Sequence, residues 1–153
     1  MKIREATEQD AEPIGKILME SYKIDSIQEG IDVFMKEREK FNYLVAEDDN
    51  VIGLVTWLQH GLPKHGLAEL DRIAVLPDLR GKGVGKQLFN TMLEKIKEYY
   101  EKNDSKLRKL YLMTHKSNIN AQEFYKKLGF KYEATLENHF HPGEHEYIMS
   151  IFM

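Results

Sequence analysis

The sequence has 153 residues, a formal net charge of −3 at pH 7 and no cysteine. This length suits one domain with a substantial core, which we expect to span residues 1–153. The lack of cysteine excludes disulfides, thiolate metal sites and thiolate nucleophiles, and the slightly negative charge excludes a domain-wide basic surface for nucleic acid.

No segment of the sequence predicts insertion into a membrane or secretion. Residues Met1–Glu8 lack the apolar region of a secretory signal, and the most apolar stretch, Val51–Leu58, is too short to span a bilayer. We therefore expect a cytoplasmic protein that binds neither nucleic acid nor membrane.

Hydrophobic periodicity and turn residues predict eleven elements. In chain order they are a strand at 2–6, helices at 11–22 and within 27–40, strands at 43–47, 51–59 and 67–76, a helix at 83–102, a strand at 107–114, a helix at 120–128, and strands at 130–136 and 146–152.

Local residues predict where two of these helices begin and end. Thr7 with Asp10 resembles a capping box before the first helix, and Asn120 with Glu123 predicts another before the last helix. Gly129 suits a left-handed residue that ends the last helix.

The order of the elements predicts the fold class. Strands outnumber helices, and adjacent antiparallel strands alternate with helical crossovers. We expect an α/β (mixed α+β) fold, with a mixed, mostly antiparallel central sheet of about six to seven strands flanked by about four helices.

A glycine-rich loop between the strand at 67–76 and the helix at 83–102 is the most informative segment. Its residues are Arg80, Gly81, Lys82, Gly83, Val84, Gly85 and Lys86. Three alternating glycines allow positive φ and a close approach of ligand to backbone. The helix start supplies unpaired N–H groups and a positive dipole end, and three cationic side chains reinforce it, so the loop predicts an anion site.

Two familiar nucleotide-binding loops do not fit this segment. A Walker A loop requires Ser or Thr where this chain has Gln87, and a dinucleotide-binding loop requires the spacing G-x-G-x-x-G. A plain strand-to-helix turn with a solvated basic rim remains the alternative interpretation.

Two blocks resemble the GNAT superfamily of N-acetyltransferases. Arg80, Gly83 and Gly85 match the family pattern Arg/Gln-x-x-Gly-x-Gly/Ala. The segment Asn118–Phe130 is similar to the family pattern N-x-x-A-x-x-F-Y-x-K-x-G-F. The resemblance implies a GNAT-like fold and acetyl-CoA as co-substrate.

The resemblance also implies roles for individual residues. Amides from Lys82 to Lys86 would bind the coenzyme pyrophosphate, backbone groups of Ile73 and Val75 would pair with the pantetheine arm, and Tyr125 would protonate the departing thiolate. The implied coenzyme contacts are Ile73, Ala74, Val75, Arg80, Gly81, Lys82, Gly83, Val84, Gly85, Lys86, Asn118 and Tyr125.

Transfer of an acetyl group to an amine requires a base, because a lysine-like amine is almost wholly protonated at pH 7. Glu69 is the first candidate, at a position where some members of the family carry a glutamate, and Asp71 is the second. The alternative is that both carboxylates are solvent-exposed or pair with Arg72 or Lys64. The family resemblance implies the Val75 amide as the donor to the oxyanion.

Other candidate residues have structural alternatives. Tyr125 could pack on the sheet, Asn118 could cap a helix, and His115 could be structural instead of relaying a proton. No metal is expected, because the ligands available between Asn138 and Glu146 match no familiar spacing. Contacts with the acceptor are expected from His139, Phe140 and Glu144. Tyr22 and the loop His60–His65 are further candidate wall residues, and Trp57 is another, although a core position is the more common one for this residue type.

The predicted function is therefore transfer of the acetyl group of acetyl-CoA to a primary amine by direct attack in a ternary complex. The acceptor would be a small, polyamine-like molecule or a protein or peptide amine. A catalytically silent module that binds CoA is the alternative function, and an unrelated nucleotide-binding domain is a third hypothesis. Dimers are common in the family, which leaves a homodimer open.

Overall fold

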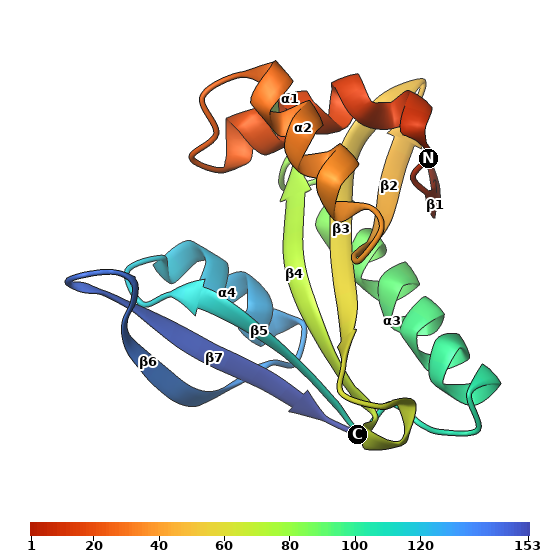
Figure 1. The fold of residues 1–153 in the computed structure, drawn as a ribbon. Helices are drawn as coiled ribbons and strands as arrows, with labels where there is room; N and C mark the ends of the chain where they lie inside the picture. Colours follow the sequence, from red (N-terminus) through yellow and green to blue (C-terminus); the bar gives the residue numbers. More distant parts are fainter. The chain divides into compact units, whose positions relative to one another are not determined.

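The computed structural model describes residues 1–153 and contains seven strands and four α-helices (Figure 1). In chain order these are β1 (Lys2–Glu5), α1 (Ala11–Ser21), α2 (Ile27–Glu37), β2 (Asn42–Asp48), β3 (Asn50–His60), β4 (Leu67–Val75), α3 (Val84–Lys102), β5 (Lys109–His115), α4 (Ile119–Lys127), β6 (Lys131–His141) and β7 (Glu144–Phe152). The predicted order of strands and α-helices is confirmed.

The strands form one sheet in the order β1-β2-β3-β4-β5-β7-β6. Pairs β1–β2, β2–β3, β5–β7 and β6–β7 are antiparallel, whereas β4 and β5 are parallel. The predicted mixed, mostly antiparallel sheet is therefore confirmed. None of the four α-helices combines the length and the apolar character that a membrane-spanning helix needs.

The chain divides into two compact units. Unit 1 consists of residues 1–58 and 71–98, and unit 2 consists of residues 59–70 and 99–153. Strands β3 and β4 each contribute to both units. The single domain expected over residues 1–153 stays a prediction.

Helices α1 and α2 cover one face of the unit 1 strands (Figure 1). Buried side chains from these helices, such as Ile14 and Phe34, form one cluster with Tyr43 and Leu54 of the strands. The neighbouring Gly53 faces Leu88 of α3 instead, because successive residues of a strand point to opposite faces. Unit 1 therefore has helices on both faces of its strands.

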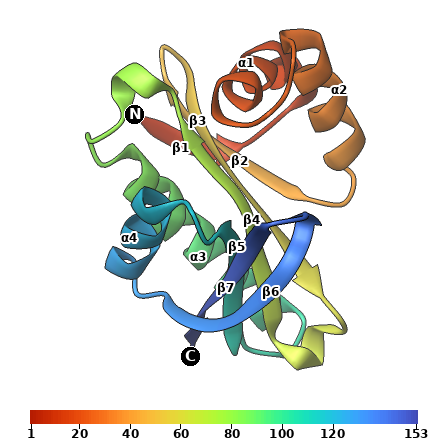
Figure 2. The same cartoon turned by 90° about the vertical axis from the view of Figure 1, so that its left-hand side faces the viewer.

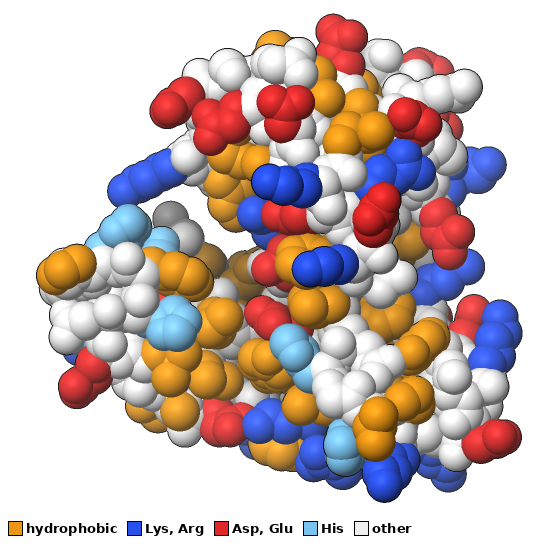
Figure 3. Space-filling view, viewed as in Figure 1, with side chains coloured by type: hydrophobic (Ala, Val, Ile, Leu, Met, Phe, Trp, Pro, Cys, Tyr) orange, Lys and Arg blue, Asp and Glu red, His pale blue; other side chains and the backbone are white.

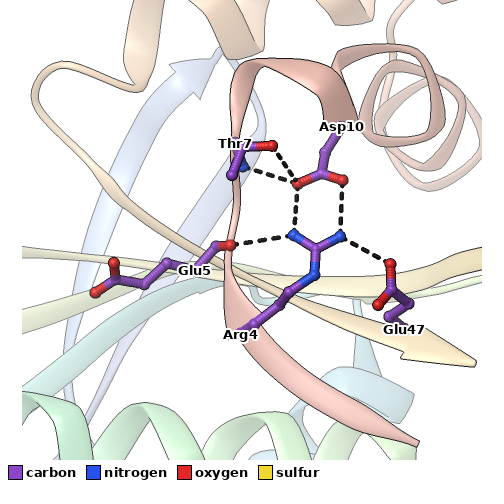
Figure 4. Close-up of polar contacts among 5 residues, drawn as sticks. All are labelled: Arg4, Glu5, Thr7, Asp10 and Glu47. Atoms are coloured by element: carbon purple, nitrogen blue, oxygen red, sulfur yellow. Dashed lines mark hydrogen bonds and ion pairs between the residues drawn. The ribbon is translucent and has the colours of Figure 1, made fainter.

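An ion-pair network joins β1 to the start of α1 and to β2 (Figure 4). The Arg4 guanidinium donates to both carboxylate oxygens of Asp10, at 2.8 and 2.9 Å, and to Glu47 at 2.9 Å. The Thr7 amide also donates to Asp10, at 2.8 Å, which provides half of the predicted capping box. The Arg4 hydrogen bonds outweigh burial and hold the pKa of Asp10 below its ordinary value.

Unit 2 contains α4 and the long hairpin of β6 and β7, in which curved β6 lies along β7 (Figure 2). The hairpin is longer than the strands predicted at 130–136 and 146–152. Its ladder is irregular between Leu136 and His141, where Asn138 takes φ 49°. The Asn138 side chain accepts from the Gly143 amide at 2.7 Å, so side-chain bonds as well as strand pairing hold the tip.

The capping residue of α4 differs from the prediction. Asn118 is the N-cap and accepts from the Ala121 amide at 3.1 Å, whereas Asn120 lies inside the helix. The predicted end is confirmed: Gly129 has φ 107°, and the Phe130 amide donates to the Tyr125 carbonyl at 3.0 Å. The predicted capping box at Asn120 was therefore wrong by two residues.

Candidate functional site

The glycine-rich loop in unit 1 has the backbone that an anion site requires. Gly81 has φ 78° and Gly83 has φ 84°, in the left-handed region that L side chains rarely adopt. No heavy atom lies within 4 Å of the place where a Cβ would sit at either glycine. The loop therefore offers exposed backbone with open space beside it.

Helix α3 begins at Val84, directly after Gly83. The Gln87 amide donates to the Gly83 carbonyl at 3.1 Å, so the amides of residues 84–86 precede the first intrahelical bond. Lys82 and Lys86 are exposed beside them. Unpaired amides, a helix dipole and two cationic side chains together suit a diphosphate.

Arg80 connects the loop to strand β4. Its Nε donates to the Val75 carbonyl at 2.9 Å, which ties the loop to the last residue of β4. The Tyr22 hydroxyl donates to the Ile73 carbonyl at 3.3 Å. Each carbonyl has a second lone pair, so both can still accept a hydrogen bond from a ligand.

Asp71 and Arg72 belong to a polar network in unit 1. Asp71 accepts from the Thr56 hydroxyl at 3.3 Å. Arg72 pairs with Glu37 at 2.7 Å and not with Glu69. Burial opposes the charge of Arg72, but the carboxylates of Glu37 and Asp71 outweigh it and raise the pKa of Arg72.

Glu69 lies in a polar cluster of unit 2. It is only 8% exposed, and its Oε1 contacts His60 Nε2 at 2.7 Å and accepts from the Tyr111 hydroxyl at 3.2 Å. Burial, and then the Glu69 charge, raises the pKa of Tyr111. The alternative that Glu69 is exposed or pairs with Arg72 or Lys64 is therefore wrong.

Tyr125 and Asn118 both take part in the architecture of α4. The Tyr125 ring packs against Phe124 and Phe130, with centroids 5.5 and 5.9 Å apart. Asn118 uses its side-chain oxygen as the helix cap. Their roles toward the coenzyme remain proposals, since each residue also has a structural task.

The residues expected near the acceptor form separate groups. The β6–β7 hairpin carries several histidines, which gather on its surface in the space-filling view (Figure 3). The His139 ring packs on Phe140, and His145 accepts from the Asn138 amide at 3.0 Å. Glu144 instead lies near His115, with an N–O separation of 3.8 Å. Trp57 is buried, as expected of a core residue.

Tyr111 and the pairing of His60 with Glu69 were not predicted from the sequence. His60 closes strand β3, and Tyr111 is opposite Glu69 in the parallel β4–β5 register. Only that register brings residues 42 positions apart in the sequence together. The one available signal was that Tyr111 is a polar residue on the strand predicted after the one that carries Glu69.

Residues 6–130 match the profile of a family described as "Acetyltransferase (GNAT) family". An uncharacterized N-acetyltransferase of Methanocaldococcus jannaschii is 28% identical over 154 residues, which cover 88% of this chain and 62% of that protein. A spermine/spermidine N(1)-acetyltransferase of Bacillus subtilis is 30% identical over 48% of this chain and 45% of its own length. An N-alpha-acetyltransferase of Sulfurisphaera tokodaii is 36% identical over 51% of this chain and 44% of its own length. The chain thus spans less than two thirds of each of these relatives.

Solved structures support the same fold. A ribosomal-protein-alanine N-acetyltransferase from Brucella melitensis superposes with a TM-score of 0.76 at 21% identity, and the match covers 100% of both chains. At this level of identity the likeness concerns the fold alone.

Proposed function

Because the chain belongs to the acetyltransferase (GNAT) family, we propose that it transfers the acetyl group of acetyl-CoA to a primary amine. The observation that carries this proposal is the loop Arg80–Lys86. Its two left-handed glycines have open space beside them, and the first amides of α3 follow at once. The loop suits the pyrophosphate of CoA, which members of the family use as co-substrate in its acetylated form.

Glu69 is the proposed general base. A buried carboxylate held by two hydrogen bonds is fixed in position, and it can take the proton that the amine must lose before attack. The His60 side chain is 36% exposed and contacts Glu69, so it offers a path for that proton to solvent. Asp71 is the second candidate base.

The remaining steps are assigned by the family resemblance. The amine nitrogen attacks the thioester carbon, and the oxyanion accepts a hydrogen bond from the Val75 amide. The C–S bond then breaks, and the thiolate takes a proton from the Tyr125 hydroxyl. The products are an amide and free CoA, and no covalent enzyme intermediate forms.

The acceptor is proposed to be a polyamine-like molecule or a protein or peptide amine. Two relatives support these classes, one named a spermine/spermidine N(1)-acetyltransferase and the other an N-alpha-acetyltransferase. The two classes differ in size and charge, so a panel of acceptors separates them.

A second candidate is a catalytically silent module that binds CoA. The structural tasks of Tyr125 and Asn118 favour this alternative, because both residues have a reason to be present without catalysis. The test is thiol release from acetyl-CoA in the presence of spermidine, N-terminal peptides and lysine peptides. Amine-dependent release supports the enzyme. Tight CoA binding with no release for any amine would support the silent module instead.

A further inference from the structure

A histidine and two glutamates meet where β5 ends and β7 begins. His115 is the last residue of β5 and is directly opposite Glu146 in the antiparallel register. Glu144 precedes Glu146 by two residues on β7, so their side chains point to the same face. One ligand atom from each of the three residues lies within 4.8 Å of the others.

The charges of this group are not balanced by protein cations. His115 Nδ1 contacts the Glu146 carboxylate directly and lies 3.8 Å from Glu144. The ion pairs of both glutamates are with His115, and neither glutamate pairs with a lysine or an arginine. Glu146 is only 3% exposed, so its charge is desolvated beside a second carboxylate. One imidazole cannot neutralise both, and a dication would.

The surrounding backbone and side chains hold the three residues in place. Buried Gln122 donates to the carbonyls of His115 and Lys116, at 3.1 and 2.8 Å. The Lys116 amide donates to the His145 carbonyl at 2.9 Å, and the Ser117 hydroxyl donates to Glu144 at 2.9 Å. Supporting bonds of this kind orient metal ligands in proteins.

We propose that His115, Glu144 and Glu146 bind a transition-metal dication, with Zn²⁺ as the best-fitting ion. One imidazole nitrogen and two carboxylate oxygens are common zinc ligands, and a three-residue set leaves a fourth position for water or another ligand. Mg²⁺ fits less well, because it prefers oxygen ligands in octahedral geometry. The bound ion links the end of β5 to the start of β7.

The sequence pattern could not find this site. The histidines near Glu144 in the sequence, at 139, 141 and 145, are not members of the group. The imidazole comes instead from β5, 31 positions before Glu146. The expectation that no metal binds rested on spacing within one segment, whereas this group depends on strand register.

The test is calorimetric titration of metal-free protein with ZnCl₂, together with thermal unfolding with and without the ion. We expect one Zn²⁺ per chain and a raised Tm, because an ion that binds the folded state stabilises it. Glu144→Gln is the main variant, since this side chain is 31% exposed and its loss does not bury an unpaired charge. It should weaken Zn²⁺ binding at least about tenfold. MgCl₂ should bind far more weakly.

His139→Gln is the matched control, because His139 is an exposed histidine of the same hairpin outside the group, and unlike His141 it is not paired with Glu144 across the hairpin. It should leave Zn²⁺ affinity unchanged, whereas His115→Gln should weaken it as Glu144→Gln does. Equal Zn²⁺ affinity in wild type and Glu144→Gln would overturn the proposal. So would the absence of Zn²⁺ binding by the folded wild type, or loss of binding in His139→Gln.

Discussion

Gly83 should determine whether the loop Arg80–Lys86 keeps its conformation and the open space beside it. Gly83→Val places a β-branched residue at φ 84° and fills the open space beside the amides. If two charged hydrogen bonds to the diphosphate are lost, at about 1.5 kcal/mol each, CoA affinity should fall on the order of a hundredfold. Calorimetric titration with CoA measures this.

Gly143→Val controls for backbone strain. Gly143 has φ 83° with nothing near its Cβ position, as at Gly83, but it lies in the β6–β7 turn. Both variants should lose comparable stability, and only Gly83→Val should lose CoA affinity. Similar CoA affinities in the two variants would show that the loop does not hold the coenzyme.

Glu69 should act as the base through its carboxylate. Glu69→Gln keeps the side-chain shape and can still accept from Tyr111, but it cannot take a proton. We expect kcat to fall by about 10²-fold or more and the pH dependence of the rate to flatten. Asp71→Asn is the comparison, and a larger loss there would transfer the role of base to Asp71.

Tyr125 combines a packing role with the proposed acid role, and one substitution separates them. Tyr125→Phe retains the ring that contacts Phe130 and removes only the hydroxyl. Stability and CoA affinity should change little, whereas kcat should fall by about 10²-fold. Unchanged turnover would leave Tyr125 with a packing role alone.

At the scale of elements, helix α4 shows how far local sequence determines structure. Asn118 and Asn120 are both good capping residues, and Glu123 favoured Asn120. The choice of Asn118 depends on the turn before the helix, where the Asn118 amide donates to the His115 carbonyl at 3.0 Å. The end of α4 could be predicted from the local sequence alone, because Gly129 is the residue there that suits φ 107°.

The two asparagines give a matched test of the cap. Asn118→Ala should lower the free energy of unfolding by about 1 kcal/mol, since it leaves the Ala121 amide without its acceptor. Asn120→Ala should be neutral or slightly stabilising, because alanine has the higher helix propensity. Chemical denaturation measures both, and a larger loss at Asn120 would contradict the assigned cap.

For the whole molecule, periodicity and turn residues predicted the order of the elements and the mixed sheet. The side-chain contacts of the proposed sites were harder to predict from the sequence. Glu69 meets Tyr111, and His115 meets Glu146, only through strand register. The conformation of the loop Arg80–Lys86 was predictable because it is a contiguous segment whose own glycines take the positive φ values.

The pH dependence of stability should reflect the network around Asp10. Its folded-state pKa lies below the ordinary 3.8, so its stabilisation is present above that pH and is lost as pH falls through the lower folded value. Asp10→Asn should therefore cost about 2 kcal/mol at pH 7 and progressively less in acid. The test is to measure the free energy of unfolding of the wild type and of Asp10→Asn between pH 7 and acid pH. A difference in stability that does not change with pH would contradict the ion pair between Arg4 and Asp10.

The central claim is that the amides of the loop Arg80–Lys86 hold the coenzyme diphosphate. Titration of ¹⁵N-labelled protein with CoA, followed by amide chemical shifts, tests it most directly. We expect the largest shifts at Gly83, Val84 and Gly85. Saturable CoA binding that leaves these amides unshifted would contradict it.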